Sequence, residues 1–187
     1  MKNLLEELEI LVEKTCKLDK NNYGYGIWSH HVKPMIQLGY ELSDEYGGDK
    51  EIITIAILLH DIASIEDPNN SKEHHIIGSK RAEAILKNYN YPDEKIDKVK
   101  SCILNHRGIV NNKKTSIEEI CVADADAIIH LKEISTLFFL AYSKMNKTME
   151  EGKIWIKGKL ERDYEKLSER SKEKYKNEFK TVIKLLE

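Results

Sequence analysis

The chain has 187 residues, and 41% of them are hydrophobic, which is enough apolar material for one domain with a substantial core. The 30 Lys and Arg residues nearly balance the 32 Asp and Glu residues, and the formal net charge of -2 gives no electrostatic case for a nucleic-acid or membrane partner. The three scattered cysteines, the absence of a signal-peptide pattern and the lack of an apolar run of about 20 residues indicate a cytoplasmic protein.

Apolar residues recur at spacings of three and four, and 3 prolines and 9 glycines interrupt them, so the sequence predicts helices almost throughout. The first helix is amphipathic and ends before the glycine-rich turn at residues 21–26. Its apolar stripe consists of Leu4, Leu5, Leu8, Leu11 and Val12. A second helix is expected to start near residues 29–31, because Pro34 is comfortable only in a first turn.

Residues 51–61 are apolar on nearly all sides, as expected of a helix buried among others, and they end in His60 and Asp61. A polar loop at residues 66–71 precedes a helix over residues 73–88. Pro92 opens a further helix that runs to about His106. Because His106 shares a face with the apolar positions of that helix, it is predicted to point inward.

A loop at residues 107–114 separates this part from a helix over residues 116–131 and an apolar stretch to residue 141. The charged segment from about residue 149 keeps a helical apolar stripe, which predicts one or two long helices that pack over the core or a partner. Its many lysines and glutamates are interpreted as a solvated face. The fold expected is therefore an all-α bundle in one domain over residues 1–187, with a helical extension at about 132–187.

Histidines and aspartates at a few positions suit a metal site, because imidazole and carboxylate are the ligands preferred by Mn, Fe, Co, Ni or Zn. The candidates are His31, His60, Asp61, His74 or His75, His106, and Asp124 or Asp126. His60 and Asp61 end the most apolar helix of the chain, where an uncoordinated buried carboxylate would be costly. Adjacent helical residues diverge by about 100°, so these two can meet at one ion only near the edge of a helix face.

Three short runs carry a family resemblance: Ser29-His30-His31-Val32, then Leu59-His60-Asp61-Ile62, then Ala123-Asp124-Ala125-Asp126. Their order and spacing resemble the histidine-aspartate (HD) domain superfamily of metal-dependent phosphohydrolases over about residues 25–131. The resemblance implies an HD-type helical bundle in which a first histidine, an adjacent His-Asp pair and a distant aspartate bind one metal. By position these ligands are His31, His60, Asp61 and Asp126.

Two positions have alternatives. His31 is preferred to His30 because an aliphatic residue follows it, as in the family pattern. The resemblance favours Asp126 as the last aspartate, whereas helical periodicity places Asp124 on the inward stripe and favours that residue instead.

Relatives with two metals carry two further histidines, and His74 and His106 occupy those places, with His75 as the alternative to His74. Asp61 would then bridge the two ions, and Mg is also compatible with such a site. In several relatives an acidic residue soon after the His-Asp pair assists the water, and here Glu66 and Asp67 are the candidates beside His60 and Asp61 for the catalytic set.

The function implied is hydrolysis of a phosphomonoester or phosphodiester of a nucleotide-like small molecule by a metal-activated water, in a monomer or a homo-oligomer. Arg107, Lys33 and His75 are the predicted substrate-binding residues. The cations Lys80, Arg81 and Lys114 also lie near the motifs in sequence. The alternative functions are a di-iron oxygenase with the same fold and a non-catalytic helical sensor or interaction module.

Overall fold

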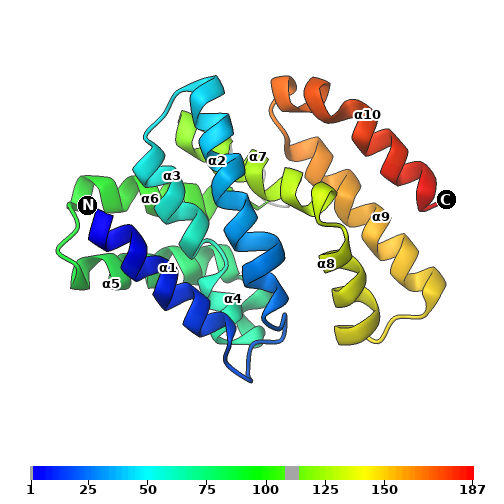
Figure 1. Cartoon of the computed structure of the whole chain (residues 1–187), viewed down its shortest axis with the longest axis horizontal. Helices are drawn as coiled ribbons and strands as arrows, with labels where there is room; N and C mark the ends of the chain where they lie inside the picture. Colours follow the sequence, from blue (N-terminus) through cyan, green and yellow to red (C-terminus); the bar gives the residue numbers. More distant parts are fainter. Residues whose placement is uncertain (1, 108–113) are drawn as a thin grey trace.

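The computed structural model describes residues 2–107 and 114–187, and these form helices joined by turns, with no strand among them (Figure 1). The prediction of an all-α fold is confirmed, while the predicted loop at residues 107–114 lies mostly outside the described residues. None of the helices in the described ranges combines the length and apolar character needed to cross a bilayer. The helices of the first part are α1 (Lys2–Cys16), η1 (Trp28–Val32), α2 (Lys33–Tyr46), α3 (Lys50–Leu59), α4 (Ile62–Glu66), η2 (Pro68–Lys72), α5 (His74–Asn88) and α6 (Asp93–Asn105). They are followed by α7 (Ile117–Lys132), α8 (Ser135–Phe138), η3 (Phe139–Lys144), α9 (Met149–Lys166) and α10 (Glu169–Leu185).

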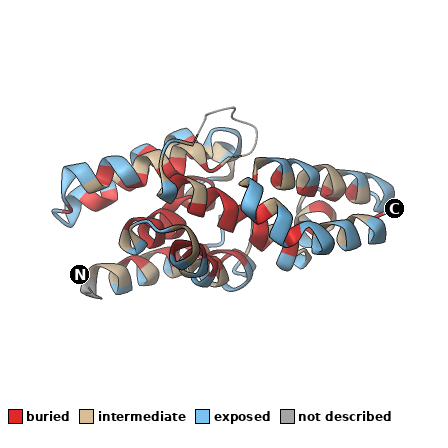
Figure 2. Ribbon diagram, turned by 90° about the horizontal axis from the view of Figure 1, so that it is seen from above, coloured by how far each residue is buried: buried red, intermediate tan, exposed pale blue. Residues whose placement is uncertain are grey.

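Helix α3 lies at the centre of the bundle and packs against α1, α2, α6 and α7. Every side chain from Ile52 to Leu59 is buried, and Figure 2 shows buried residues along the inner faces of the surrounding helices. The Asp49 side chain caps the start of α3 by accepting hydrogen bonds from the Glu51 and Ile52 amides. The predicted central helix is therefore present, and its carboxyl end delivers His60 and Asp61 to the interior.

The second helical run begins earlier than predicted. The π turn η1 (Trp28–Val32) precedes α2, and the amide of Lys33 donates to the carbonyl of Trp28, five residues back. Pro34 does lie in the first turn of α2. The wider π turn suits a proline there, because Pro34 has no amide hydrogen and its ring would crowd a carbonyl in a regular helix. In this turn His31 is buried and His30 is exposed.

The C-terminal segment forms two long helices, α9 and α10, and both pack against α7 (Figure 1). A capping box between Thr148 and Glu151 begins α9. Ser168 caps the start of α10, and its own amide donates to Asp124 on α7. The sequence predicted that the polar residues of this segment are solvated. Some of them instead face the bundle.

Candidate metal centre

Six of the predicted ligands converge from five parts of the chain. They are His31 in η1, His60 and Asp61 in the turn between α3 and α4, His74 at the start of α5, His106 just after α6, and Asp126 in the middle of α7. One ligand atom from each of His31, His60 and Asp61 lies within 4.8 Å of the others, and the same holds for Asp61, His74 and His106. Asp126 Oδ1 lies 3.5 Å from His31 Nε2. The histidine-aspartate pattern of the sequence is therefore one cluster in space.

Asp61 belongs to both groups because a helix break turns its carboxylate inward. Helix α3 ends at Leu59, and Asp61 occupies the position that precedes α4, so the two residues do not lie on one continuous helix as predicted. Asp61 Oδ2 lies 3.2 Å from His60 Nε2, and Asp61 Oδ1 lies 3.4 Å from His74 Nε2. The two oxygens of one carboxylate thus face two different histidine groups.

The hydrogen bonds of His74 and His106 direct the Nε2 atoms of the two rings toward each other. Each ring donates its Nδ1 proton to a backbone carbonyl three residues earlier, Ser71 at 2.8 Å and Ile103 at 2.6 Å. The two Nε2 atoms are thereby directed at each other and lie only 3.1 Å apart. A proton or a metal cation shared between two such nitrogens stabilises this arrangement. Backbone carbonyls that orient imidazoles in this way are typical partners of metal-ligating histidines.

Electrostatics in the cluster keep Asp61 ionised and His31 and His106 neutral, while His60 holds its proton more tightly than usual. Burial, together with the neighbouring histidines, lowers the pKa of His31 to about 3 and that of His106 well below its usual value. Burial opposes ionisation of Asp61, but His60 and the other imidazoles outweigh it and hold the Asp61 pKa well below the usual range. For His60 burial again opposes the charge, and Asp61 outweighs it and raises the pKa of His60 to about 9. Asp61 therefore remains an anion and attracts positive charge into the cluster.

Comparison with known proteins identifies the family. The family model of the HD domain matches residues 28–130, more than half of the chain. The chain belongs to the HD domain family. The HD superfamily is one of metal-dependent phosphohydrolases, and the clustered His and Asp side chains of this member are able to bind a metal ion.

A relative of this HD domain protein is an uncharacterized protein of Clostridium beijerinckii (strain ATCC 51743 / NCIMB 8052), which is 33% identical over 95 residues. The aligned part is 51% of this chain and 58% of that protein, so the match spans less than two thirds of the relative. No solved structure matches the chain.

The two aspartates of α7 have different surroundings in this HD domain. Asp126 faces the histidine cluster, whereas Asp124 accepts hydrogen bonds from the amide and the hydroxyl of Ser168 at the start of α10. Both carboxylates are buried, so Asp124 does point inward as periodicity predicted. It faces α10, however, and not the cluster of histidine and aspartate side chains. The geometry agrees with the choice of Asp126 that the family resemblance favoured.

Alanine at each of these positions is expected to have a distinct effect. Asp124→Ala removes the anchor of α10 and should lower the free energy of unfolding by about 1–2 kcal/mol, with metal affinity close to that of the wild type. Asp126→Ala should weaken metal binding at least about tenfold. Urea unfolding in chelator and metal titration of both variants measure these effects. Equal loss of metal by Asp124→Ala would contradict the assignment.

Four further residues near the cluster were missed at the sequence level. His130 follows Asp126 by four residues on α7, and its ring stacks on His31 with centroids 4.8 Å apart. Lys159, Asp163 and Lys166 come from α9, beyond the segment that the family model matches. Asp163 lies on the same helical stripe as the buried Ile156 and Leu160, and this carboxylate on an apolar stripe was the available signal.

Lys166 of α9 contacts two members of the histidine and aspartate cluster. Its buried ammonium group pairs with Asp126 Oδ2 and donates to the carbonyl of His106 at 3.1 Å. Asp163 lies 3.6 Å from the same ammonium and 3.2 Å from His130 Nδ1. Burial lowers the pKa of Lys166, but Asp126 and Asp163 outweigh burial and raise the Lys166 pKa above its usual value. One oxygen of Asp126 is thus held by a lysine, and the other faces His31.

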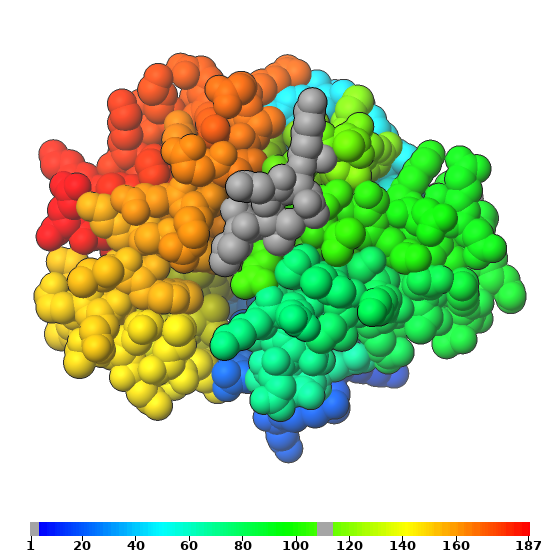
Figure 3. Space-filling model, turned by 180° about the vertical axis from the view of Figure 1, so that it is seen from behind, coloured from blue at the N-terminus to red at the C-terminus, as the bar shows by residue number. Residues whose placement is uncertain are grey.

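The cluster lines a cavity of about 450 Å³. On the face seen in Figure 3, the yellow and orange segment of α8, η3 and α9 adjoins the teal and green segment that runs from α4 to α6. Besides the cluster, several cationic side chains line this cavity: Arg107, Lys144, Lys159, Arg162 and Lys166. An anion bound beside the metal ligands would therefore meet positive charge from the C-terminal helices.

The structure does not bring every predicted site residue to this cavity. Glu66 is paired with Arg81, whose Nε donates to it at 2.9 Å, and Asp67 is exposed and caps η2 through the amide of Asn69. Neither carboxylate lines the cavity, so the geometry gives no support to their predicted catalytic role, which stays a prediction.

Of the predicted substrate-binding residues, one lines the cavity and two do not. Arg107 lines the cavity and donates to the backbone carbonyl of Lys72. Lys33 is exposed on α2 and does not line the cavity. His75 does not line the cavity, and among the described residues its buried Nδ1 has no hydrogen-bond partner. His74, and not His75, is the member of the pair that faces Asp61.

Proposed function

We propose that this HD domain protein hydrolyses a phosphate ester of a nucleotide-like small molecule with two divalent metal ions. The observation that carries the proposal is the position of Asp61, whose two carboxylate oxygens face two separate histidine groups. A carboxylate in that arrangement is suited to bridging two ions, and paired ions act on both oxygens of an in-line displacement at phosphorus.

The ligands divide between the two ions. His31, His60, Asp61 and Asp126 are proposed to hold one ion, and Asp61, His74 and His106 the other. The ions, when bound, supply a water molecule of lowered pKa and polarise the phosphoryl oxygens. His31 and His106 are neutral and Asp61 is ionised, so these ligands need no proton loss before they bind metal, whereas His60 must release the proton that Asp61 stabilises.

The other residues of the cavity position the ester. Arg107 offers a planar fork of donors, of the kind that binds two phosphate oxygens at once. Lys166 holds Asp126 so that Oδ1 stays turned toward His31. The net charge of the chain is slightly negative, so this local group of cations, and not the whole surface, supports an anionic substrate.

The experiment that tests the proposal is metal analysis coupled to a screen for phosphate release. We expect purified protein to bind two transition-metal ions per chain, and chelation to abolish release of phosphate from at least one ester in a panel of nucleotides, cyclic nucleotides and sugar phosphates. Mn, Fe, Co, Ni or Zn should restore it. Absence of hydrolysis with every divalent metal would contradict the proposal. Oxygen consumption by the iron-loaded protein without phosphate release would instead favour the di-iron oxygenase.

A further inference from the structure

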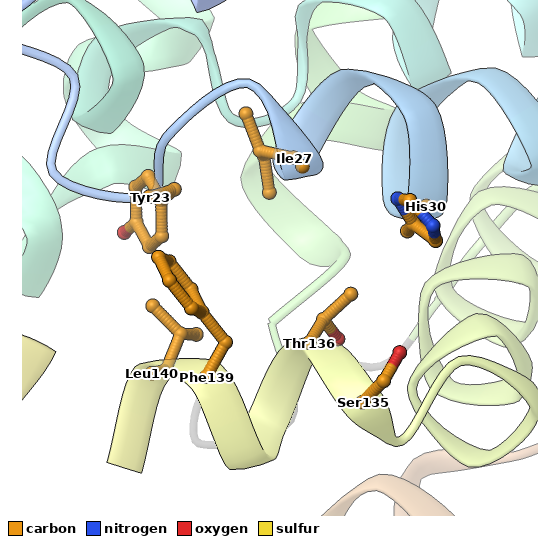
Figure 4. A pocket seen from close by; sticks show the side chains of 8 residues that line it. Tyr23, Ile27, His30, Ser135, Thr136, Phe139 and Leu140 are labelled. Carbon is orange, nitrogen blue, oxygen red and sulfur yellow. The ribbon is translucent and has the colours of Figure 1, made fainter. Parts of the chain in front are cut away.

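A second hollow adjoins the cavity that the histidine and aspartate cluster lines, called the metal cavity below. It has a volume of about 200 Å³ and lies between the turn at the start of η1 and the α8–η3 segment (Figure 4). Tyr23, Ile27, Thr136 and Leu140 line both this pocket and the metal cavity. The two hollows therefore share a wall, and a ligand bound to the metal cluster can extend into the pocket.

The pocket has an apolar end and a polar end. Figure 4 shows the rings of Tyr23 and Phe139 beside Leu140 at one end. At the other end His30, Thr136 and Ser135 present a ring nitrogen and two hydroxyl groups. This combination suits a flat ring that stacks on aromatic carbon and carries hydrogen-bonding groups at its edge.

The polar groups of the pocket keep free hydrogen-bonding capacity. The Ser29 hydroxyl lies 2.7 Å from Nδ1 of His30, which leaves Nε2 of that ring for a ligand. The Thr136 hydroxyl donates to the carbonyl of Glu133 at 2.8 Å, so its oxygen can still accept a hydrogen bond. His30 and His31 follow each other in the π turn, and one faces this pocket while the other faces the metal cluster.

We infer that this pocket is the subsite for the organic part of the substrate and takes a flat heteroaromatic ring of the nucleobase type. The inference rests on the proposed function for the phosphate end of the ligand, which would lie among the metal ligands. The ring would stack against Phe139 and Tyr23, and its edge would bond to His30 and Thr136.

Gly26 offers a way to close the pocket. It lines the hollow, a Cβ built on it meets no other described residue within 4 Å, and its backbone is outside the left-handed region. A leucine at this position therefore adds apolar bulk to the lining of the pocket without backbone strain. Phe139, which is 43% exposed and lines only the pocket, gives a second variant on the opposite wall.

The test is equilibrium binding, measured by titration calorimetry on the full chain loaded with Mn²⁺ in the presence of fluoride or at low temperature to slow turnover. The probes are the four ribonucleoside 5′-monophosphates and ribose 5-phosphate, which has the same phosphate and sugar but no base.

We expect at least one nucleotide to bind about tenfold or more tightly than ribose 5-phosphate, because stacking and burial of a base favour binding. Gly26→Leu and Phe139→Ala should each reduce that ratio toward one. Ile154→Ala, at an exposed position of α9 outside both hollows, is the control and should keep it.

Equal affinities for ribose 5-phosphate and all four nucleotides in the wild type would overturn the inference. So would a preference for a nucleotide that both pocket variants retain. These results are separate from the screen for phosphate release. A preference for a nucleotide that depends on the pocket, without hydrolysis of any ester, would support the subsite and contradict the proposed hydrolysis. Hydrolysis of an ester without such a preference would support the proposed hydrolysis and contradict the subsite.

Discussion

Replacing Asp61 by asparagine is expected to reduce phosphate release at least about 10³-fold and to lower the number of metal ions bound per chain. The change preserves the size of the side chain but removes the charge that faces both histidine groups. The amide group also places a nitrogen where a ligand oxygen is needed, so at least one of the two histidine groups loses its anionic partner. Phosphate release at saturating metal and metal content after dialysis measure the effect.

The matched control is Asp67→Asn, which lies on an exposed turn nearby and caps η2. It should retain metal binding and activity close to the wild type. Circular dichroism should show the same helical content for both variants, because Asp61 accepts no capping hydrogen bond from α4 through its side chain. A correctly folded Asp61→Asn protein with wild-type activity would contradict the proposed bridging role and would favour a non-catalytic module.

Replacing Lys166 by methionine is expected to lower the free energy of unfolding by about 3–5 kcal/mol, measured by urea denaturation in chelator. The methionine fills similar space, but it leaves Asp126 as a buried carboxylate without its lysine, whereas Asp163 keeps its ion pair with Lys159. Both side chains of the Lys166–Asp126 pair are at most 7% exposed, so solvent does little to screen the loss.

Lys157→Met is the control on the same helix, because Lys157 pairs with Glu187 at the surface, where an ion pair contributes less than about 1 kcal/mol. The double variant Asp126→Asn with Lys166→Met should recover part of the stability that Lys166→Met loses, because one unpaired charge is then removed as well. If Lys166→Met proved no less stable than Lys157→Met, the buried pair would not be the link between α9 and the metal cluster.

Local sequence signals were sufficient for most helices. The apolar run that begins at residue 51 and Pro92 before an amphipathic run predicted helix starts that the structure has within a residue or two. Capping and helical periodicity depend on neighbours within about four positions, so they can be read directly from the chain. The π turn before Pro34 was not anticipated, because a widened turn has no distinct pattern of residue types.

The choice between paired candidates depended on contacts between distant segments. Asp124 and Asp126 are both buried on α7, and what separates them is that Ser168 faces one and His31 faces the other. His74 and His75 differ in the same manner, since only His74 faces Asp61. Periodicity indicates that a side chain points inward, but it does not identify the partner it meets there.

The sequence alone therefore determined the all-α fold, the family and the set of histidines and aspartates from which a metal site is built, because these follow from periodicity and from short runs such as His60-Asp61. Only the tertiary structure decided which oxygens and nitrogens face one another, and that α9 returns Lys166 to Asp126 across 40 positions of the chain. A lysine on a charged helix has the same local pattern whether it is solvated or buried. Its environment is set by the packing of α9 on α7, through contacts that no local pattern records.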